Sequence, residues 1–122
     1  MSEELFAVRD IQHVPKPWGY ELIFAKTHRY VGKILHINRG ESLSLQYHEM
    51  KEETLFVVEG EMKLTIEYEG DRREITLRKG EAFHIPPRLI HRMKAVVDTD
   101  VAEVSTPELQ DVVRLEDRYG RV

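Results

Sequence analysis

Cysteine is absent from the 122-residue sequence, so the chain has neither a disulfide framework nor thiolate chemistry, as is typical of a reducing cytoplasm. No apolar run is long enough to cross a membrane, and the acidic start MSEELFAVRD lacks the apolar core of a signal peptide. A lysine- or arginine-rich stripe is also missing, and the net charge is -4, which argues against a nucleic-acid surface. We therefore expect a cytoplasmic protein that binds neither nucleic acid nor membranes.

Helical periodicity is scarce, and short strand-like runs separated by glycine turns take its place. The length suits a single domain with one core. This pattern predicts an all-β sandwich or barrel, with one helical turn at 105–108. The expected strands are 18–25, 30–37, 42–48, 53–58, 61–68, 73–77, 82–85, 91–97, 101–104 and 112–115.

The N-terminal segment differs from the rest of the chain. Residues 1–17 have few apolar residues at mixed spacing, and two prolines make 13–17 a stiff, extended linker. We therefore expect residues 1–17 to form an N-terminal arm, with a short strand as the alternative. Residues 18–122 then form the β-barrel domain with a C-terminal tail.

Four residues with the side chains of metal ligands lie on or beside the expected strands. Polar residues alternate with leucine and tyrosine in 42–48, so Gln46 and His48 project from one face. Glu53 opens the next run after a charged loop, and His91 follows a Pro-Pro corner. Each of these residues, taken singly, is more often an ordinary sheet residue than a ligand. Together they offer two imidazoles, a carboxylate and an amide oxygen, so we predict Gln46, His48, Glu53 and His91 as ligands of a divalent cation.

The spacing of these residues carries a family resemblance. The chain resembles the cupins, whose first motif places a Gly, two His-type ligands, a Glu and a Gly, and whose second places Gly, Pro and His. Gln46 stands where the commonest cupins have His, and Arg88 where the second motif usually has Gly. The resemblance implies a single-domain, cupin-type jelly-roll β-barrel. The matching positions are Gly40, Gln46, His48, Glu53 and Gly60, then Gly80, Pro86 and His91.

Further motifs narrow the resemblance. Pro17-Trp18-Gly19, the segment 43–48 and the closing VRLEDRYGR look like the type II phosphomannose isomerase cupin domain. In that family the domain is often the C-terminal part of a bifunctional mannose-1-phosphate guanylyltransferase and mannose-6-phosphate isomerase. No P-loop-like or pyrophosphorylase glycine-rich segment is seen, so we expect the guanylyltransferase half to be absent. Lys16 and Lys51 replace family arginines, and Thr54 replaces a histidine.

This resemblance implies an isomerase that interconverts mannose 6-phosphate and fructose 6-phosphate. The cation, zinc first with manganese, iron, cobalt or nickel as alternatives, would act as a Lewis acid on the open-chain sugar and stabilise an enediolate. His84 and Lys51 are the candidate bases. The candidate phosphate-binding cations are Arg88, Arg92, Lys33, Arg118 and Arg121.

Two other functions remain open from the sequence. A barrel with two histidines and a carboxylate also suits a metal-dependent oxygenase, although Gln46 argues mildly against it. The third reading is a non-catalytic, metal-containing module that binds a sugar or another metabolite and shows ligand-induced stabilisation without turnover.

The run Leu55-Phe56-Val57-Val58 is apolar on both strand faces, which predicts a cover on each side. A small barrel covers only the inner face, so we expect a homodimer packed sheet to sheet. Leu43, Leu45 and Tyr47 are expected to extend the outward patch. The alternative is that a loop or the N-terminal arm of the same chain covers it.

Overall fold

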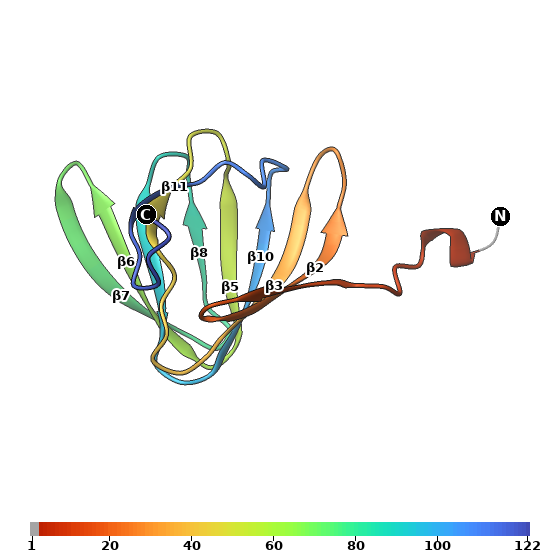
Figure 1. Ribbon diagram of the computed structural model, residues 1–122, viewed down its shortest axis with the longest axis horizontal. Helices are drawn as coiled ribbons and strands as arrows, with labels where there is room; N and C mark the ends of the chain where they lie inside the picture. Colours follow the sequence, from red (N-terminus) through yellow and green to blue (C-terminus); the bar gives the residue numbers. More distant parts are fainter. Residues whose placement is uncertain (1–2) are drawn as a thin grey trace.

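The computed structural model describes residues 3–122, which form two antiparallel β-sheets and one short 3-10 helix, η1 (Figure 1). The expected all-β fold is thereby confirmed. None of the described helices has the length and apolar composition needed to cross a membrane. The elements are η1 Glu3–Phe6, β1 Gln12–Lys16, β2 Gly19–Lys26, β3 Val31–Ile37, β4 Leu45–Tyr47, β5 Glu53–Glu59, β6 Glu61–Tyr68, β7 Asp71–Arg78, β8 Ala82–Ile85, β9 Ile90–Ala95, β10 Thr99–Ser105 and β11 Val113–Glu116.

The two sheets face each other as the walls of a barrel. One has the strand order β1-β2-β3-β10-β5-β8 and the other β11-β4-β9-β6-β7. Figure 1 shows the sheets converging at one end and spreading at the other, where the β4–β5 and β8–β9 connections lie. The side chains between them form one hydrophobic core, because alternate residues of each strand point inward. Its buried members include Trp18, Leu35, Ile37, Leu55, Val57, Met62, Leu64, Ile85, Met93 and Val101.

The segment expected as a linker at 13–17 lies in the six-stranded sheet. Residues 12–16 form β1, which pairs with β2 at the sheet edge. A proline is tolerated on an edge strand because one side of that strand makes no hydrogen bonds to a neighbouring strand, so an N–H on that side is not needed. The tight turn into β2 requires Gly19, whose φ is +152° and where a Cβ would lie 1.9 Å from the carbonyl oxygen of His36.

The helical turn expected at 105–108 is wrong. Ser105 is the last residue of β10, and no helix is described over residues 105–108. The reason is that Thr106 pairs with Glu52 instead of capping a helix. Its backbone N–H donates to the carbonyl of Glu52 at 3.0 Å, and its hydroxyl accepts from the N–H of Glu52 at 3.0 Å.

Strand β5 has one face in the core and one in solvent. Leu55 and Val57 are fully buried, while Phe56 and Val58 are 43% and 41% exposed on the outer face of the six-stranded sheet. Leu43, Leu45 and Tyr47 do not extend this outer patch as expected, because β4 and the residues before it belong to the other sheet. Leu43 packs against the core and Leu45 is buried.

Candidate functional site

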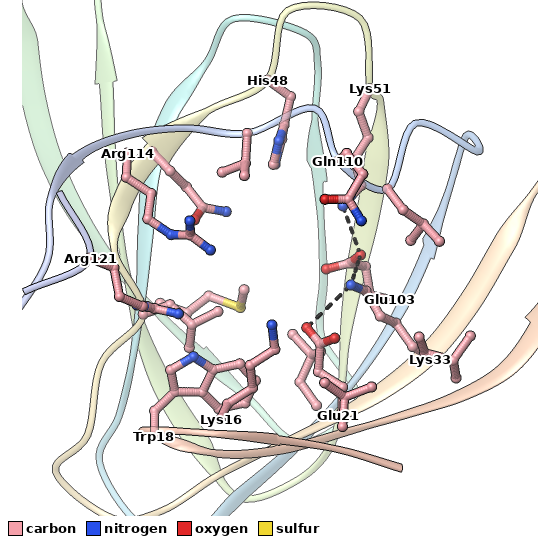
Figure 2. A pocket seen from close by; sticks show the side chains of 18 of the residues that line it. Lys16, Trp18, Glu21, Lys33, His48, Lys51, Glu103, Gln110, Arg114 and Arg121 are labelled. Atoms are coloured by element: carbon pink, nitrogen blue, oxygen red, sulfur yellow. Dashed lines mark hydrogen bonds and ion pairs between the residues drawn. The ribbon is translucent and has the colours of Figure 1, made fainter. Parts of the chain in front are cut away.

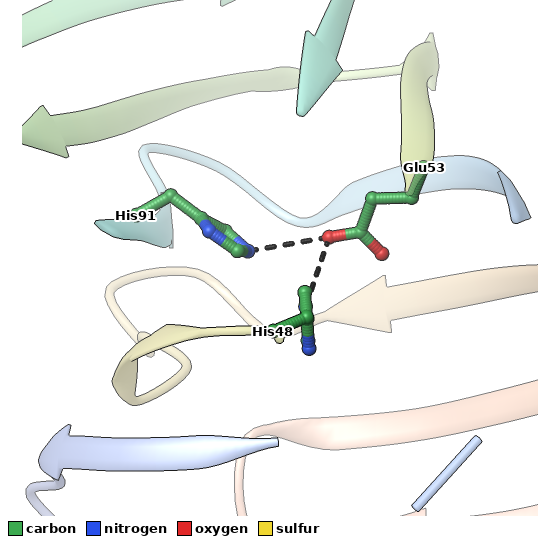
Figure 3. A group of neighbouring side chains, drawn as sticks. All are labelled: His48, Glu53 and His91. Atoms are coloured by element: carbon green, nitrogen blue, oxygen red, sulfur yellow. Dashed lines mark ion pairs between the residues drawn. The ribbon is translucent and has the colours of Figure 1, made fainter. Parts of the chain in front are cut away.

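Three of the four predicted ligands converge at the open end of the barrel. His48 follows β4, Glu53 begins β5 and His91 lies in β9, so the two sheets contribute to one cluster (Figure 3). Nε2 of His48 lies 3.3 Å and Nε2 of His91 3.2 Å from Oε1 of Glu53. One ligand atom from each residue falls within 4.8 Å of the others, and all three side chains are buried. This spacing suits a single cation between them.

The hydrogen bonds around the cluster leave its inner atoms available to a cation. Nδ1 of His48 donates to the carbonyl of Asp111 at 2.6 Å, and Nδ1 of His91 donates to that of Leu89 at 2.9 Å. Since a carbonyl only accepts, each ring carries its proton on Nδ1 and turns an Nε2 lone pair toward Glu53. Both Nε2 atoms and Oε1 of Glu53 are buried without a hydrogen-bond partner, and Oε2 of Glu53 has only an ion pair with Lys51. Unsatisfied buried groups are costly, and a divalent ion would satisfy all of them.

Glu53 is held as a carboxylate. Burial by itself raises the pKa of Glu53, but the charge of Lys51, whose Nζ lies 3.2 Å from Oε2, lowers it and favours the carboxylate. A carboxylate is the form that binds a metal ion. The charge state of the cluster therefore agrees with the ligand role predicted for it.

Gln46, the fourth predicted ligand, lies opposite His91 in the β4–β9 pair. Its side chain lines the same cavity as His48. The amide oxygen of Gln46 accepts a hydrogen bond from the hydroxyl of Ser44 at 2.6 Å. Since a carbonyl-type oxygen has two lone pairs, this bond leaves one for a cation. The ligand role of Gln46 stays a prediction.

A cavity of about 360 Å³ opens beside His48, between the sheets (Figure 2). Trp18, Leu35 and Met93 form an apolar part of its wall, and the segment after β10 closes one side. The charged part carries more cations than carboxylates. Its charged residues are Lys16, Lys26, Lys33, Lys51, Arg114 and Arg121 against Glu21 and Glu103.

A chain of buried ion pairs runs along the cavity wall from the cluster. Nζ of Lys51 lies 3.2 Å from Oε2 of Glu53 and 3.2 Å from Oε2 of Glu103. Nζ of Lys33 lies 3.6 Å from the same Glu103 oxygen and 3.2 Å from Oε2 of Glu21. Burial lowers the pKa of Lys51, but the charges of Glu103 and Glu53 outweigh it and raise that pKa above its usual value. Lys51 and Lys33 are therefore already neutralised by protein carboxylates.

The remaining cations of the cavity wall differ in whether a protein carboxylate already binds them. Arg121 donates to both oxygens of Asp117, at 2.9 and 2.8 Å. Lys16 and Arg114 have no ion pair within residues 3–122, and Nε of Arg114 is buried without a hydrogen-bond partner. Figure 2 shows both side chains reaching into the cavity. Lys16 and Arg114 were not among the binding residues predicted from the sequence, although Lys16 stands where the resembling family has an arginine, which was a signal.

The structure brings only some of the other predicted residues to the cavity. Lys33, Lys51 and Arg121 line it. His84 does not, because it pairs with Thr54 on the outer face of the six-stranded sheet, where its Nε2 lies 2.5 Å from Glu52.

The three other predicted arginines also lie outside the cavity. Arg88 is 78% exposed, with Nε 3.4 Å from Glu49. Arg92 follows His91 in β9 and therefore points to the opposite face of its sheet. Arg92 and Arg118 line a separate crevice there. These three side chains are not positioned to bind a substrate beside His48.

Comparisons with known proteins agree with this architecture. Residues 33–106 match the family model of the cupin domain. Over 117 residues the chain is 38% identical to mannose-1-phosphate guanylyltransferase of Escherichia coli K12, covering 91% of this chain and 23% of that protein. Over 84 residues it is 34% identical to 3-hydroxyanthranilate 3,4-dioxygenase of Xanthomonas oryzae, covering 66% of this chain and 48% of that protein. The chain thus spans less than half the length of either relative.

The structure of KdgF from Halomonas sp. superposes with a TM-score of 0.69 at 26% identity, covering 84% of this chain and 91% of that one. The predicted resemblance to the cupins is confirmed, and the similarity to mannose-1-phosphate guanylyltransferases agrees with the narrower resemblance. Because the matched segment includes the three clustered ligands and extends over more than half of the sequence, the chain belongs to the cupin domain family.

Proposed function

We propose that this protein is a metal-dependent sugar-phosphate isomerase that interconverts mannose 6-phosphate and fructose 6-phosphate. The observation that carries the proposal is the charge of the cavity beside the ligand cluster. Six lysines and arginines but only two glutamates line it, in a chain with a net charge of -4. A cationic pocket in an acidic protein favours an anionic ligand. The similarity to a mannose-1-phosphate guanylyltransferase supports a phosphorylated sugar.

The ligand cluster would bind one end of the substrate and the cavity cations would bind the other. A divalent ion held by His48, Glu53, His91 and Gln46 would supply a Lewis acid for the carbonyl and adjacent hydroxyl of the open-chain sugar. Zinc is our first candidate, with manganese, iron, cobalt and nickel as alternatives, since the two-nitrogen, two-oxygen set accepts each of them.

At the other end, the phosphate needs donors that no protein carboxylate already occupies. Lys16 and Arg114 meet this condition, since neither has an ion pair in the described part of the chain. Arg121 and Lys33 line the same cavity but also hold Asp117 and Glu21. We therefore assign the phosphate first to Lys16 and Arg114, with Arg121 and Lys33 contributing charge.

Lys51 is the proposed catalytic residue that lies within the site. Its ammonium group stands between Glu53 and Glu103 at the cavity wall. Because these carboxylates keep Lys51 protonated, it is not the base expected from the sequence and would instead donate a hydrogen bond to the sugar oxygen that gains charge. Glu103, the cavity-lining carboxylate of the same ion pair, would accept the proton that carbon two loses. His84 is no longer proposed, because it faces away from the cavity.

The test is metal analysis of the purified protein, followed by an isomerase assay on mannose 6-phosphate with the metal restored. We expect turnover that requires metal and is lost in Glu53→Gln, while unphosphorylated mannose is a poor substrate. The outer-face variant His84→Ala should keep its activity and is the matched control. Metal binding without turnover would reject the isomerase and leave the non-catalytic metabolite-binding module.

A second candidate is a metal-dependent oxygenase. Two histidines and one carboxylate around open positions also form the ligand set of iron oxygenases, and a relative with 34% identity is a dioxygenase. Oxygen consumption by the iron-loaded protein would support this alternative. The surplus of cavity cations favours the isomerase over an oxygenase with an uncharged organic substrate.

We also propose a cytoplasmic homodimer. The outer face of the six-stranded sheet exposes large apolar side chains, and such a face is typical of a protein interface. A second copy of the chain would cover it through a two-fold axis. The absence of cysteine supports the cytoplasmic assignment. The exposed side chains are Phe24, Tyr30, Phe56, Val58 and Val104.

A further inference from the structure

Asp111 lies in the segment that follows β10 and reaches over to the loop between two metal ligands. Its Oδ1 accepts from the backbone N–H of Glu49 at 3.0 Å. Its Oδ2 accepts from the N–H groups of Met50 at 2.7 Å and Lys51 at 2.9 Å. One carboxylate therefore holds three successive backbone groups of a loop that is 60 positions away in the sequence.

The backbone of Asp111 acts on the ligand itself. Its carbonyl accepts the Nδ1 proton of His48 at 2.6 Å, which leaves Nε2 of that ring free to face Glu53. The choice of ring nitrogen in a metal-binding histidine is set by the bond that the other nitrogen makes. The same residue thus holds the loop with its side chain and the tautomer of His48 with its main chain.

Other contacts hold the two ends of this loop but leave its centre to Asp111. The carbonyl of His48 accepts from the N–H of Arg88 at 2.7 Å, and Glu52 is held by Thr106. Residues 49–51 have only the carboxylate of Asp111 as a partner for their N–H groups among the described bonds. Without it, the loop that sets the separation between His48 and Glu53 would exchange these bonds for water.

The geometry points to Asp111 as a positioning residue of the metal centre, one that orients His48 and holds the loop leading to Glu53. This inference rests on the metal site of the proposed function but not on isomerase activity. Asp111 also connects the cavity wall to the metal ligands, because its neighbours Gln110 and Val112 line the cavity. A displacement of residues 110–112 would therefore shift the metal ligands through the hydrogen bonds of Asp111.

The test is a Co²⁺ titration of the folded, metal-free protein, followed by visible absorption. Loss of a residue that orients a metal ligand typically weakens metal affinity about 10- to 100-fold, and we expect a loss in this range for Asp111→Ala. Asp111→Asn should fall between this variant and the wild type, because an amide oxygen restores part of the acceptor set. NMR of His48 in the metal-free protein should show Nδ1 protonated in the wild type and mixed tautomers in Asp111→Ala.

The matched control is Asp98→Ala. Asp98 also holds a loop, since its carboxylate accepts from the N–H of Arg39 at 2.8 Å, but it precedes β10 at the end opposite the metal cluster. This variant should bind Co²⁺ as the wild type does. Wild-type Co²⁺ affinity in folded Asp111→Ala, or in Asp111→Asn if the alanine variant does not fold, would overturn the inference. So would a wild-type protein that binds no Co²⁺.

Discussion

Nζ of Lys51 lies 3.2 Å from Oε2 of Glu53, so a residue of the cavity wall and a predicted metal ligand share one buried ion pair. The same ammonium group bonds Glu103, and all three side chains are at most 6% exposed. Lys51 therefore connects the cavity wall to the cluster of His48, Glu53 and His91.

The first prediction concerns the charge of Lys51. Lys51→Met would leave Glu53 buried without a charged partner and Glu103 with only Lys33, and breaking a buried pair in this way costs about 3–5 kcal/mol. We expect a loss of this size in the free energy of unfolding, measured by urea denaturation of the metal-free protein. Lys51→Arg keeps the charge and should lose much less. Equal stability of the methionine variant and the wild type would show that the pair contributes nothing.

The second prediction concerns the ligand cluster. His91→Ala removes one of three buried donors, so metal retention should fall by more than the roughly 10- to 100-fold that follows loss of a supporting partner. Equilibrium dialysis followed by metal analysis would measure this. His84→Ala, on the outer face, should retain metal as the wild type does. Undiminished metal in His91→Ala would remove this histidine from the ligand set.

The third prediction concerns the unpaired cavity cations. A hydrogen bond to a charged group contributes about 1.5–3 kcal/mol, so Lys16→Gln and Arg114→Gln should each raise KM for mannose 6-phosphate about 10-fold or more. Neither should change metal content. Arg92→Gln, in the crevice on the other side of the five-stranded sheet, is the control. An unchanged KM in both cavity variants would place the phosphate elsewhere.

The fourth prediction concerns pH. Hydrogen bonds from Arg121 lower the pKa of Asp117 from 3.8 to about 2. A pKa lowered by folding adds stability above the unfolded pKa, and this stability is lost as pH falls through the folded value. The wild type should therefore be more stable than Asp117→Asn at neutral pH, and the difference should shrink between pH 3.8 and about 2. Thermal unfolding of both proteins over this range is the measurement. A difference that is constant with pH would contradict it.

The fifth prediction concerns assembly. Phe56→Glu places a charge on the exposed apolar face of the six-stranded sheet, where desolvation would oppose association. We expect a dimer for the wild type and a monomer for this variant by light scattering. Tyr68→Glu changes a side chain of the other sheet that is also exposed and should remain dimeric. A monomeric wild type at micromolar concentration would show that this face does not form the dimer.

Local patterns were enough to predict the positions of all the described strands except β1, and the three residues that cluster as a candidate metal site. In the expected strand 61–68, Met62 and Leu64 are buried, while Tyr68 at the end of the strand is exposed. His48, Glu53 and His91 were recognisable because motif spacing survives in the order of residues along the chain. The residues that support these ligands were not recognisable, because Asp111 is 63 positions from His48.

The placement of charges depended on which sheet each strand joined. His84 and Arg92 are close in sequence to the second motif, yet strand parity turns both side chains away from the cavity. Leu43 was expected outside and lies inside, because β4 pairs with β9 in the five-stranded sheet. Which residues of a strand share a face follows from the local sequence. Which of the two faces points to the core depends on how that strand packs in the folded protein.

The sequence by itself determined the all-β class, the family and the three residues that cluster as a candidate metal site, since these follow from periodicity and spacing along one chain. Only the tertiary structure decided which cations remain unpaired, which residue holds the metal loop and which strand face is exposed. These features arise from contacts between segments that are distant in sequence, such as Lys51 with Glu103 and His48 with Asp111. The candidate site therefore combines residues that can be recognised in the sequence with hydrogen-bond and ion-pair partners that only the folded chain brings close to them.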